Sequence, residues 1–397
     1  MTTWTARLDA AAWPADFIVP PPSASLGEWE ESACALFPGL APALLATPQD
    51  PVHHAEGDVW THTKMVVQAL LDDPDYARAS RSRQGVLFYA ALLHDIAKPA
   101  TTREQDGRII APGHSPKGAV DARVALWEHD VPFVLREQVC RLIESHQVPF
   151  FAFDNRKGIR PDFTARLQAA DRSVDLLCIL AAADMRGRFC ADQQKVLDDI
   201  ALFREQAHEL DCLDQPYAFP DAATRMAYFR SQGERYADEP VHVEDPFEVI
   251  LMSGLPASGK NTWVADRPQI PVVSYDDLRE EFGFKPGEGT GTLVHAATDR
   301  MREFLRRRET FIVNATHLSR QMRRRTLDLV SDYGGSVRVV YCEAPRSDLL
   351  SRNAKRDTTL NNKKLLEMTS RWEVPGFDEV SALDVLLGSA PRRRPAP

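Results

Sequence analysis

The sequence predicts a two-domain protein, in which an all-α domain is followed by an α/β domain with a parallel sheet. Its 397 residues are enough for two or three domains, each with a core of its own. In the first part, apolar residues recur every three or four positions, which is typical of amphipathic helices. In the last part, short β-branched runs alternate with helical segments, as in a parallel sheet covered by helices.

The helical region extends from about Leu26 to Arg235. Proline and glycine separate its periodic segments, which marks helix ends. The segments that carry the pattern are "THTKMVVQALLDD", "GVLFYAALLHDIAK", "DARVALWEHD", "LREQVCRLIESH", "SVDLLCILAAADMRGR" and "QKVLDDIALFREQAHEL". Few stretches here are convincing strands, so we expect residues 1–235 to form an all-α domain with its main features at 51–188.

An acidic, proline-bounded segment, 236–246, is expected to link the two domains. After it, the runs "FEVILMSG", "PVVSYDD", "TFIVNAT" and "SVRVVYCE" predict four strands. Helices are expected between them, over "THLSRQMRRRTLDLVSDY" and around "LVHAATDRMREFLRRR". We assign 247–388 to the α/β domain and expect 389–397, "SAPRRRPAP", to be a disordered tail.

Composition favours a soluble cytoplasmic protein. Hydrophobic residues make up 44% and charged residues 26% of the chain, which is ordinary for a globular protein. No apolar run reaches membrane-spanning length, and the N-terminus lacks the pattern of a secretory signal. The six cysteines include no CxxC pair, which indicates reduced thiols and no disulfide framework.

The net charge of −9 hides an asymmetry between the two parts of the chain. Residues 1–246 carry a net charge of −13, whereas 247–397 carry +4. The basic side chains of the second part cluster in "RRR" (306–308), "RQMRRR" (320–325) and "SRNAKR" (351–356). Such clusters are usually solvated helix faces, but three of them in one domain favour a polyanionic substrate.

A glycine-rich turn, "GLPASGK", follows the first predicted strand and precedes a helix. This G-x-x-x-x-G-K spacing in that context predicts a phosphate-binding loop, whose backbone N–H groups meet phosphate oxygens. The lysine would reach the β- and γ-phosphates. Asn261 replaces the usual Ser or Thr after the lysine, which makes direct Mg²⁺ ligation less secure. The residues expected to hold the nucleotide are Gly254, Ser258, Gly259, Lys260, Asn261 and Thr262.

Further polar residues follow the next strands. Asp276 and Arg279 come where ligands of open α/β folds bind; the carboxylate is suited to accept a proton and the arginine to bind phosphate. The alternative for such an Asp is a helix N-cap. Arg352 and Arg356, four residues apart, suit a lid over a transferring phosphoryl group or, alternatively, a solvated face.

Two residues near the end of the domain have an open role. Trp372 and Val374 belong to "RWEVPGFDE". They are expected to pack either against a nucleotide base or against the core.

A set of histidines and aspartates in the helical region predicts a metal centre. A His–Asp pair inside an apolar stretch indicates a site, because a buried carboxylate needs a partner. Imidazole with carboxylate suits one or two transition-metal ions, such as Mn, Ni, Co, Zn or Fe. Lys98 is expected to steady a phosphate oxygen, and His54 ranks below His62 as a ligand. The expected ligands are His62, His94, Asp95, His114, His146 and Asp184, with His114 and His146 completing a second site that shares Asp95.

The motifs of the second domain, in their order, resemble the 5′-hydroxyl polynucleotide kinases. The resemblance rests on the phosphate loop, "DDLR", "NAT", "SRNAKR" and "WEVPGFDE" and covers most of 247–379. It implies ATP or another NTP with Mg²⁺ as the donor. It also implies that Asp276 is the general base on a 5′-OH, that Arg279 holds the acceptor's 3′-phosphate, and that Arg352 and Arg356 form the lid.

The first domain resembles the HD superfamily of metal-dependent phosphohydrolases, through "HAEGDVWTHT", "HDIAKPATT", "GHSPKGA" and "ADMRGR". These motifs are similar to the HD domain of bacterial tRNA nucleotidyltransferases, which implies hydrolysis of phosphomonoesters or 2′,3′-cyclic phosphates. Together the two domains resemble the HD-kinase family of end-healing enzymes. That resemblance implies RNA or DNA ends as substrates and a separate ligase as a partner.

Two other functional classes are consistent with the same residues. The first domain would then hydrolyse nucleotides or second messengers while the second phosphorylates a small molecule. Alternatively, occupancy of the phosphate loop would only switch partners, as in a nucleotide-gated regulator.

Overall fold

The computed structural model describes residues 4–154, 160–244, 246–285, 288–355 and 360–388. The chain divides into two compact units, 1–218 and 219–397. The predicted tail 389–397 and the predicted lid residue Arg356 lie outside the described residues.

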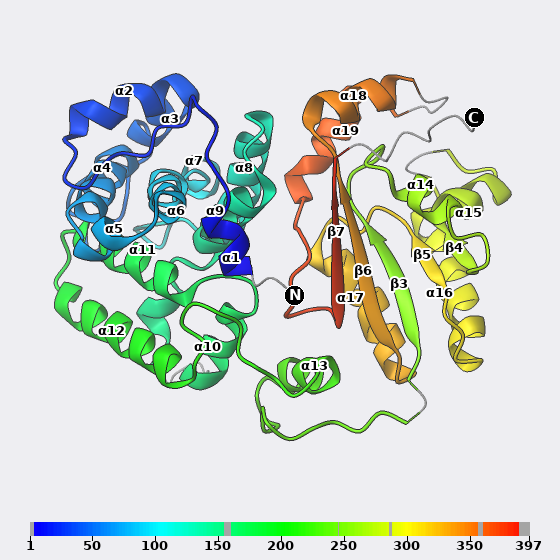
Figure 1. Ribbon diagram of the computed structural model, residues 1–397. Coiled ribbons are helices and arrows are strands. Elements are labelled where there is room, and N and C mark those ends of the chain that lie inside the picture. Colours follow the sequence, from blue (N-terminus) through cyan, green and yellow to red (C-terminus); the bar gives the residue numbers. More distant parts are fainter. Residues whose placement is uncertain (1–3, 155–159, 245, 286–287, 356–359, 389–397) are drawn as a thin grey trace. The chain divides into compact units, whose positions relative to one another are not determined.

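The first unit is helical, as predicted (Figure 1). Its helices are α1 (Trp4–Asp9), α2 (Leu26–Leu36), α3 (Leu40–Leu45), α4 (Val59–Leu71), α5 (Pro74–Arg78), α6 (Arg81–Leu93), α7 (Lys98–Thr101), α8 (His114–Glu128), α9 (Phe133–Ser145), η1 (Val148–Phe151), α10 (Pro161–Ala169), α11 (Val174–Arg186) and α12 (Gln193–Glu209). One small antiparallel hairpin, β1 (Arg103–Gln105) and β2 (Arg108–Ile110), interrupts them.

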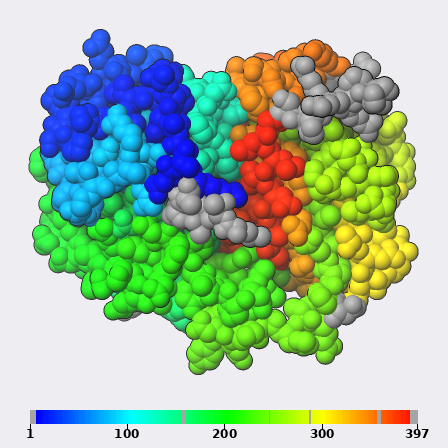
Figure 2. All heavy atoms as spheres, viewed as in Figure 1, coloured from blue at the N-terminus to red at the C-terminus, as the bar shows by residue number. Residues whose placement is uncertain are grey.

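Helix α6 is the centre of this unit, since most of its length is buried and it packs against α4, α9 and α11. The N-terminal segment, blue in Figure 2, lies over part of the unit's surface in that view. Its carbonyls accept hydrogen bonds from two tyrosines of the core, Tyr76 to Pro20 and Tyr89 to Ile18, at 2.6 and 2.8 Å. The segment before Pro51 is therefore an integral part of the helical fold.

The second unit is an α/β fold with a five-stranded, all-parallel sheet of order β4-β5-β3-β6-β7. The strands are β3 (Glu248–Ser253), β4 (Val272–Ser274), β5 (Ile312–Asn314), β6 (Ser336–Glu343) and β7 (Ala382–Leu387). The helices are α13 (Ala222–Arg230), α14 (Lys260–Ala265), α15 (Tyr275–Glu281), α16 (Thr290–Arg306), α17 (Arg320–Asp332), α18 (Arg346–Ala354), α19 (Asn362–Glu367) and η3 (Met368–Arg371). The four predicted strands are confirmed, and β7 is an additional edge strand.

Strand order explains where a ligand can bind. The chain passes from β3 to one side for β4 and β5 and then crosses to the other side for β6. Ligands of open parallel sheets bind at such a reversal, outside the carboxyl ends of the strands. Ser253 ends β3 at this edge, and Ser274 of β4 lies opposite Asn314 of β5.

The division between the units falls ahead of the predicted linker. Helix α13, which the sequence placed in the first domain, belongs to the second unit. Arg225 donates to the carbonyls of Val380 and Ser381, and Arg230 donates to that of Leu327. These side-chain contacts are invisible to helical periodicity, which reports a helix but not its partner.

Across the described residues, no helix has both the length and the apolar composition that a membrane span requires.

Candidate functional site

The six predicted metal ligands come together inside the first unit. They form two groups whose ligand atoms lie within 4.8 Å of one another: His62 with His94 and Asp184, and Asp95 with His114 and His146. They come from α4, α8 and α11 and from the turns that end α6 and α9. Elements far apart in the sequence thus converge on one buried centre.

Short distances join the two groups. His62 Nε2 lies 3.1 Å from Asp184 Oδ1 and 3.3 Å from His94 Nε2. Asp95 Oδ2 lies 3.1 Å from His94 Nε2 and Oδ1 lies 3.5 Å from His114 Nε2. Asp95 therefore faces both groups, as expected for a carboxylate shared by two ions.

The His–Asp pair lies in a turn, not within a helix as the sequence suggested. Helix α6 ends at Leu93, and His94 is its C-cap. Because the last carbonyls of a helix have no partner within it, the Ala91 carbonyl is free to accept from His94 Nδ1 at 2.8 Å. The turn thereby fixes the imidazole that the centre needs.

Burial and neighbouring charges set the protonation of the centre. Burial opposes the ionised form of Asp95, but His94 and Lys98 outweigh it and hold its pKa well below the usual range. Asp184 has a lowered pKa as well, because Arg188 and His62 outweigh its burial. Burial lowers the pKa of His146 to about 3. At neutral pH these groups are therefore two carboxylates and a neutral imidazole.

His62 differs, since burial lowers its pKa but hydrogen bonds with Asp184 and Glu56 outweigh burial and raise it. A nitrogen that binds a cation must be deprotonated, so a cation at Nε2 of His62 would oppose this shift. In addition, His146 Nε2 is buried without a hydrogen-bond partner among the described residues. An orphaned imidazole nitrogen beside two carboxylates fits a transition-metal ion.

Two basic residues balance the carboxylates. Lys98 Nζ lies 2.7 Å from Asp95 Oδ2 and 2.6 Å from Gln49 Oε1. Arg188 donates to both oxygens of Asp184, at 2.9 and 2.7 Å. Lys98 thus lies at the centre, where Asp95 and Gln49 engage two of the three N–H donors of its ammonium group.

The phosphate loop of the second unit adopts the backbone that its sequence predicts. Gly254 and Gly259 have φ of +135° and +111°, which favours glycine. A Cβ on Gly254 would lie only 2.1 Å from the carbonyl oxygen of Cys342. Lys260 Nζ donates to the carbonyls of Gly254 and Leu255, both at 2.8 Å. The buried Ser258 Oγ has no hydrogen-bond partner in the described part of the chain. The loop fits a phosphate group.

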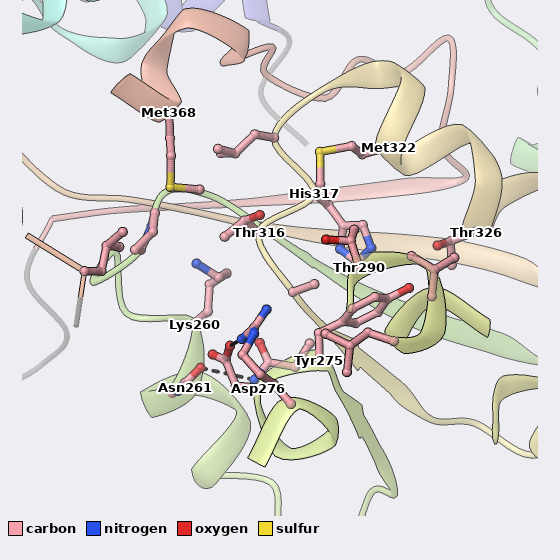
Figure 3. A pocket seen from close by; sticks show the side chains of 18 of the residues that line it. Lys260, Asn261, Tyr275, Asp276, Thr290, Thr316, His317, Met322, Thr326 and Met368 are labelled. Atoms are coloured by element: carbon pink, nitrogen blue, oxygen red, sulfur yellow. Dashed lines mark hydrogen bonds and ion pairs between the residues drawn. The ribbon is translucent and has the colours of Figure 1, made fainter. Parts of the chain in front are cut away.

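Asn261, next to the lysine, shares a hydrogen bond with the end of β5. Asn314 Nδ2 donates to Asn261 Oδ1 at 3.1 Å. Lys260, Asn261 and Asp276 gather in one part of the cavity (Figure 3). Thr262 and Thr316 also line it.

Asp276 and Arg279 lie on α15, directly after β4, and form an ion pair of 2.5 Å. Ser274 caps this helix, accepting from Asp277 N. Because Ser274 is the N-cap, Asp276 is not occupied as one and its carboxylate can serve the cavity it lines.

One large cavity, of about 1700 Å³, begins at the phosphate loop and lies entirely within the second unit. It extends past Tyr275 and Asp276 to Met322 and Arg325 on α17. Arg352 lines it too, 3.5 Å from Asp348.

Sequence reasoning missed His317, which also lines the cavity. Its backbone is left-handed (φ +40°), and its ring Nδ1 donates to Met252 O at 2.9 Å.

Trp372 and Val374 lie in the core and not along this cavity. Trp372 is 1% exposed and Val374 3% exposed. The indole Nε1 of Trp372 donates to Tyr341 Oη at 2.9 Å. Of the two packing partners expected for them, the structure places them against the core.

Sequence reasoning also missed three polar residues around the metal centre. Gln49 stands in no motif and precedes the first of the periodic segments quoted above. Glu56 and Arg188 stand inside the motifs "HAEGDVWTHT" and "ADMRGR", so proximity to the ligands was a signal for them. Their roles became visible only through their contacts in space.

Comparison with known proteins agrees with the two units. Residues 59–184 match the HD domain family, and 249–375 match a family described as an AAA domain. A Multifunctional CCA protein from Halorhodospira halophila is 32% identical over 148 residues, which are 37% of this chain and 33% of that protein. The chain therefore spans about a third of the length of this relative.

Two solved structures overlap 36% of the chain. One is a protein described as a kinase from Chloroflexus aurantiacus, with 18% identity, a TM-score of 0.30 and 89% of its chain covered. The other is a sugar kinase from a Janibacter species, with 21% identity, a TM-score of 0.27 and 85% of its chain covered. The domain matches, the buried His–Asp centre and the phosphate loop identify the chain as an HD phosphohydrolase-type domain fused to a P-loop kinase-like domain.

Proposed function

We propose that this chain heals broken polynucleotide ends, phosphorylating a 5′-OH in the second unit and removing a 2′,3′-cyclic or 2′/3′-phosphate in the first. A cleaved RNA commonly carries these two ends, and a ligase that needs 3′-OH and 5′-phosphate cannot join them. In this proposal the second unit adds phosphate to one end of the break, and the first unit removes phosphate from the other end.

The observation that carries the kinase half is the cavity. Small-molecule sites have volumes of about 300–1,000 Å³, whereas this one has about 1700 Å³. It has room for a nucleotide at the phosphate loop and for an extended acceptor beyond Asp276. Arginines along it, such as Arg325 and Arg352, suit a polyanionic acceptor.

In this proposal, Lys260 binds the β- and γ-phosphates of an NTP held with Mg²⁺. Asp276 accepts the proton of the attacking 5′-OH as a new O–P bond forms and the β–γ bridge breaks, releasing the nucleoside diphosphate. Arg279 binds the acceptor's 3′-phosphate through guanidinium donors other than the Nη1 that contacts Asp276. Arg352 stabilises charge on the transferring group, and Asn261 orients the Mg²⁺ hydration shell.

In the first unit, His62, His94 and Asp184 would hold one ion and His114 and His146 the second, with Asp95 shared between the two. A transition metal there lowers the pKa of water toward neutrality and polarises a phosphoryl oxygen. Lys98, whose ammonium group has three N–H donors, contacts a phosphate oxygen beside its contacts with Asp95 and Gln49. Water first opens the cyclic phosphate to a monoester, and a second water releases inorganic phosphate and leaves the hydroxyl.

The test uses an oligonucleotide with a 5′-OH and a 2′,3′-cyclic phosphate, in RNA and DNA versions. We expect 5′-phosphate only with ATP and Mg²⁺, and loss of the cyclic phosphate without ATP once Mn²⁺, Ni²⁺, Co²⁺, Zn²⁺ or Fe²⁺ is added. Turnover of mononucleotides or sugars with none of oligonucleotides would contradict the proposal in favour of a small-molecule enzyme. Nucleotide binding without any turnover would indicate a regulator.

A further inference from the structure

We infer that Glu56 is a positioning residue of the metal centre. Its carboxylate holds the imidazole of His62 so that Nε2 of that ring faces the ions. Glu56 is not among the predicted ligands, and its side chain is 1% exposed. The inference rests on the proposed metal centre but not on the proposed substrates.

Three imidazoles of the centre are oriented by their own turns. His94, His114 and His146 each place Nδ1 2.8 Å from the carbonyl three residues earlier, those of Ala91, Ala111 and Ile143. His94 and His146 are the C-caps of α6 and α9. Carbonyls in the last turn of a helix lack an intrahelical partner, so they are available to these rings.

His62 has no such local acceptor. It lies near the start of α4, where carbonyls accept from the N–H groups of the next turn: Asp58 O, for example, accepts from His62 N at 3.1 Å. Its ring therefore needs an acceptor from elsewhere in the chain. Nδ1 finds two, Gly187 O at 3.1 Å and Glu56 Oε1 at 3.0 Å.

Glu56 is itself held on both oxygens. Oε1 lies 2.8 Å from His54 Nδ1, and Oε2 accepts from Phe189 N at 3.0 Å. Gly187 and Phe189 flank Arg188, which grips the ligand Asp184. Glu56 thus connects the imidazole of His62 to the segment 187–189, which directly follows the helix that carries Asp184.

His54, Glu56 and His62 could instead hold an ion of their own, since their ligand atoms lie within 4.8 Å. The hydrogen bond from His62 Nδ1 to Gly187 O argues against this, because a nitrogen that donates its proton has no lone pair for a metal. A carboxylate on the far nitrogen of a ligating histidine orients the ring and raises its basicity, and loss of such a partner costs 10- to 100-fold in metal affinity or activity.

The test is a calorimetric titration of metal-free protein with Mn²⁺, with the ions per chain counted at saturation. For Glu56→Gln, which keeps the shape but removes the charge, we expect one binding event to weaken about 10- to 100-fold and the number of ions at saturation to stay the same. The matched control is Asp121→Asn, which removes a carboxylate paired with Lys117 on the surface of α8; its titration should equal that of the wild type.

Unchanged affinity in Glu56→Gln overturns the inference, and so does the loss of one ion at saturation, which would make Glu56 a ligand. If Glu56→Gln fails to fold, Glu56→Asp replaces it, because the shorter side chain keeps the charge but no longer reaches His62. An Mn²⁺ affinity of Glu56→Asp equal to that of the wild type would likewise overturn the inference. Wild-type protein that binds no Mn²⁺ overturns the metal centre as well. If the variant binds Mn²⁺ more weakly but the wild type does not hydrolyse the 2′,3′-cyclic phosphate, the inference stands and only the proposed substrate is overturned.

Discussion

The metal centre of the first unit and the phosphate site of the second are built in opposite ways. All six candidate ligands of the metal centre are buried, and four of them are 0% exposed. In the phosphate site, the side chain of Asp276 is 68% exposed and faces a cavity of about 1700 Å³. One site is assembled when the helices pack, whereas the other remains an open cavity.

This difference follows from the chemistry that each site would perform. Ligands of a transition-metal ion must meet at fixed short distances, so their rings are held by hydrogen bonds to neighbouring elements. Phosphoryl transfer depends mainly on positioning and charge, which the substrates complete on binding. We therefore expect the two sites to respond independently to mutation, to ligands and to pH.

The largest expected effect is loss of phosphoryl transfer in Lys260→Ala. Removal of one preorganised cation or donor at a developing charge costs about 10²- to 10³-fold in rate, and the loop offers no second lysine. Transfer of label from ATP to a 5′-OH oligonucleotide measures this, and hydrolysis in the first unit should be unchanged. Lys363→Ala, an exposed lysine of α19, is the control. Retention of transfer in Lys260→Ala would show that the phosphate site is misassigned.

The reciprocal change is Asp95→Ala in the metal centre. Since residues that only support metal ligands cost 10- to 100-fold, we expect loss of the shared carboxylate to reduce hydrolysis of the 2′,3′-cyclic phosphate by about a hundredfold or more. Phosphoryl transfer should stay at the wild-type level. Asp198→Ala, an exposed aspartate of α12, should leave both reactions intact. A parallel drop of both reactions in Asp95→Ala would refute the independence of the sites.

Ligands should stabilise the two units separately. An ion present at a hundred times its dissociation constant stabilises the folded state by about 2.7 kcal/mol, which raises the melting temperature of a unit of this size by about 5–10 °C. Mn²⁺ added to chelated protein should therefore raise only the transition of the helical unit. Mg-ATP should raise only the other transition. Calorimetry resolves the two, and a common shift with either ligand would show that the units are coupled.

The last effect, similar in size to that of ligand binding, concerns the acid stability of the helical unit. Burial opposes the charge of Glu137, but Arg123 and Arg136 outweigh it and lower its pKa from 4.5 to about 2. A depressed pKa stabilises the folded state above pH 4.5 and this contribution, about 3 kcal/mol, is lost as pH falls toward 2. Glu137→Gln should be less stable than the wild type at pH 7. The difference in free energy of unfolding between the two, called the gap below, should narrow below pH 4.5. Urea unfolding at several pH values measures the gap, and a constant gap would contradict the assigned cause.

Much of the fold could be predicted from the sequence because both periodicities are strong. The apolar spacing of α4 or α9 and the β-branched runs of β3 and β6 report burial directly. Strand β7 was missed because it is a half-exposed edge strand without a clear alternation. Helix α13 lies in the region that the sequence assigned to the first domain, whereas it belongs to the second unit, since its partners are carbonyls distant in sequence.

The candidate ligands could be predicted for a different reason. Histidine and aspartate in apolar stretches are rare unless they are paired, so His94 and Asp95 stand out. A supporting residue such as Gln49 does not, because a polar residue in a loop outside any motif has no unusual pattern. Trp372 shows the limit in the other direction: a tryptophan fits a base or a core equally well until its neighbours are known.

The most direct test of the account combines both variants on one nicked RNA with a 2′,3′-cyclic phosphate and a 5′-OH. With ATP, Mg²⁺ and Mn²⁺, the wild type should make this RNA sealable by a separate ligase that requires 3′-OH and 5′-phosphate. Lys260→Ala alone and Asp95→Ala alone should each fail, and a mixture of the two should restore sealing. Failure of the mixture, with the wild type active, would contradict two independent sites on one chain, and failure of the wild type would contradict end healing itself.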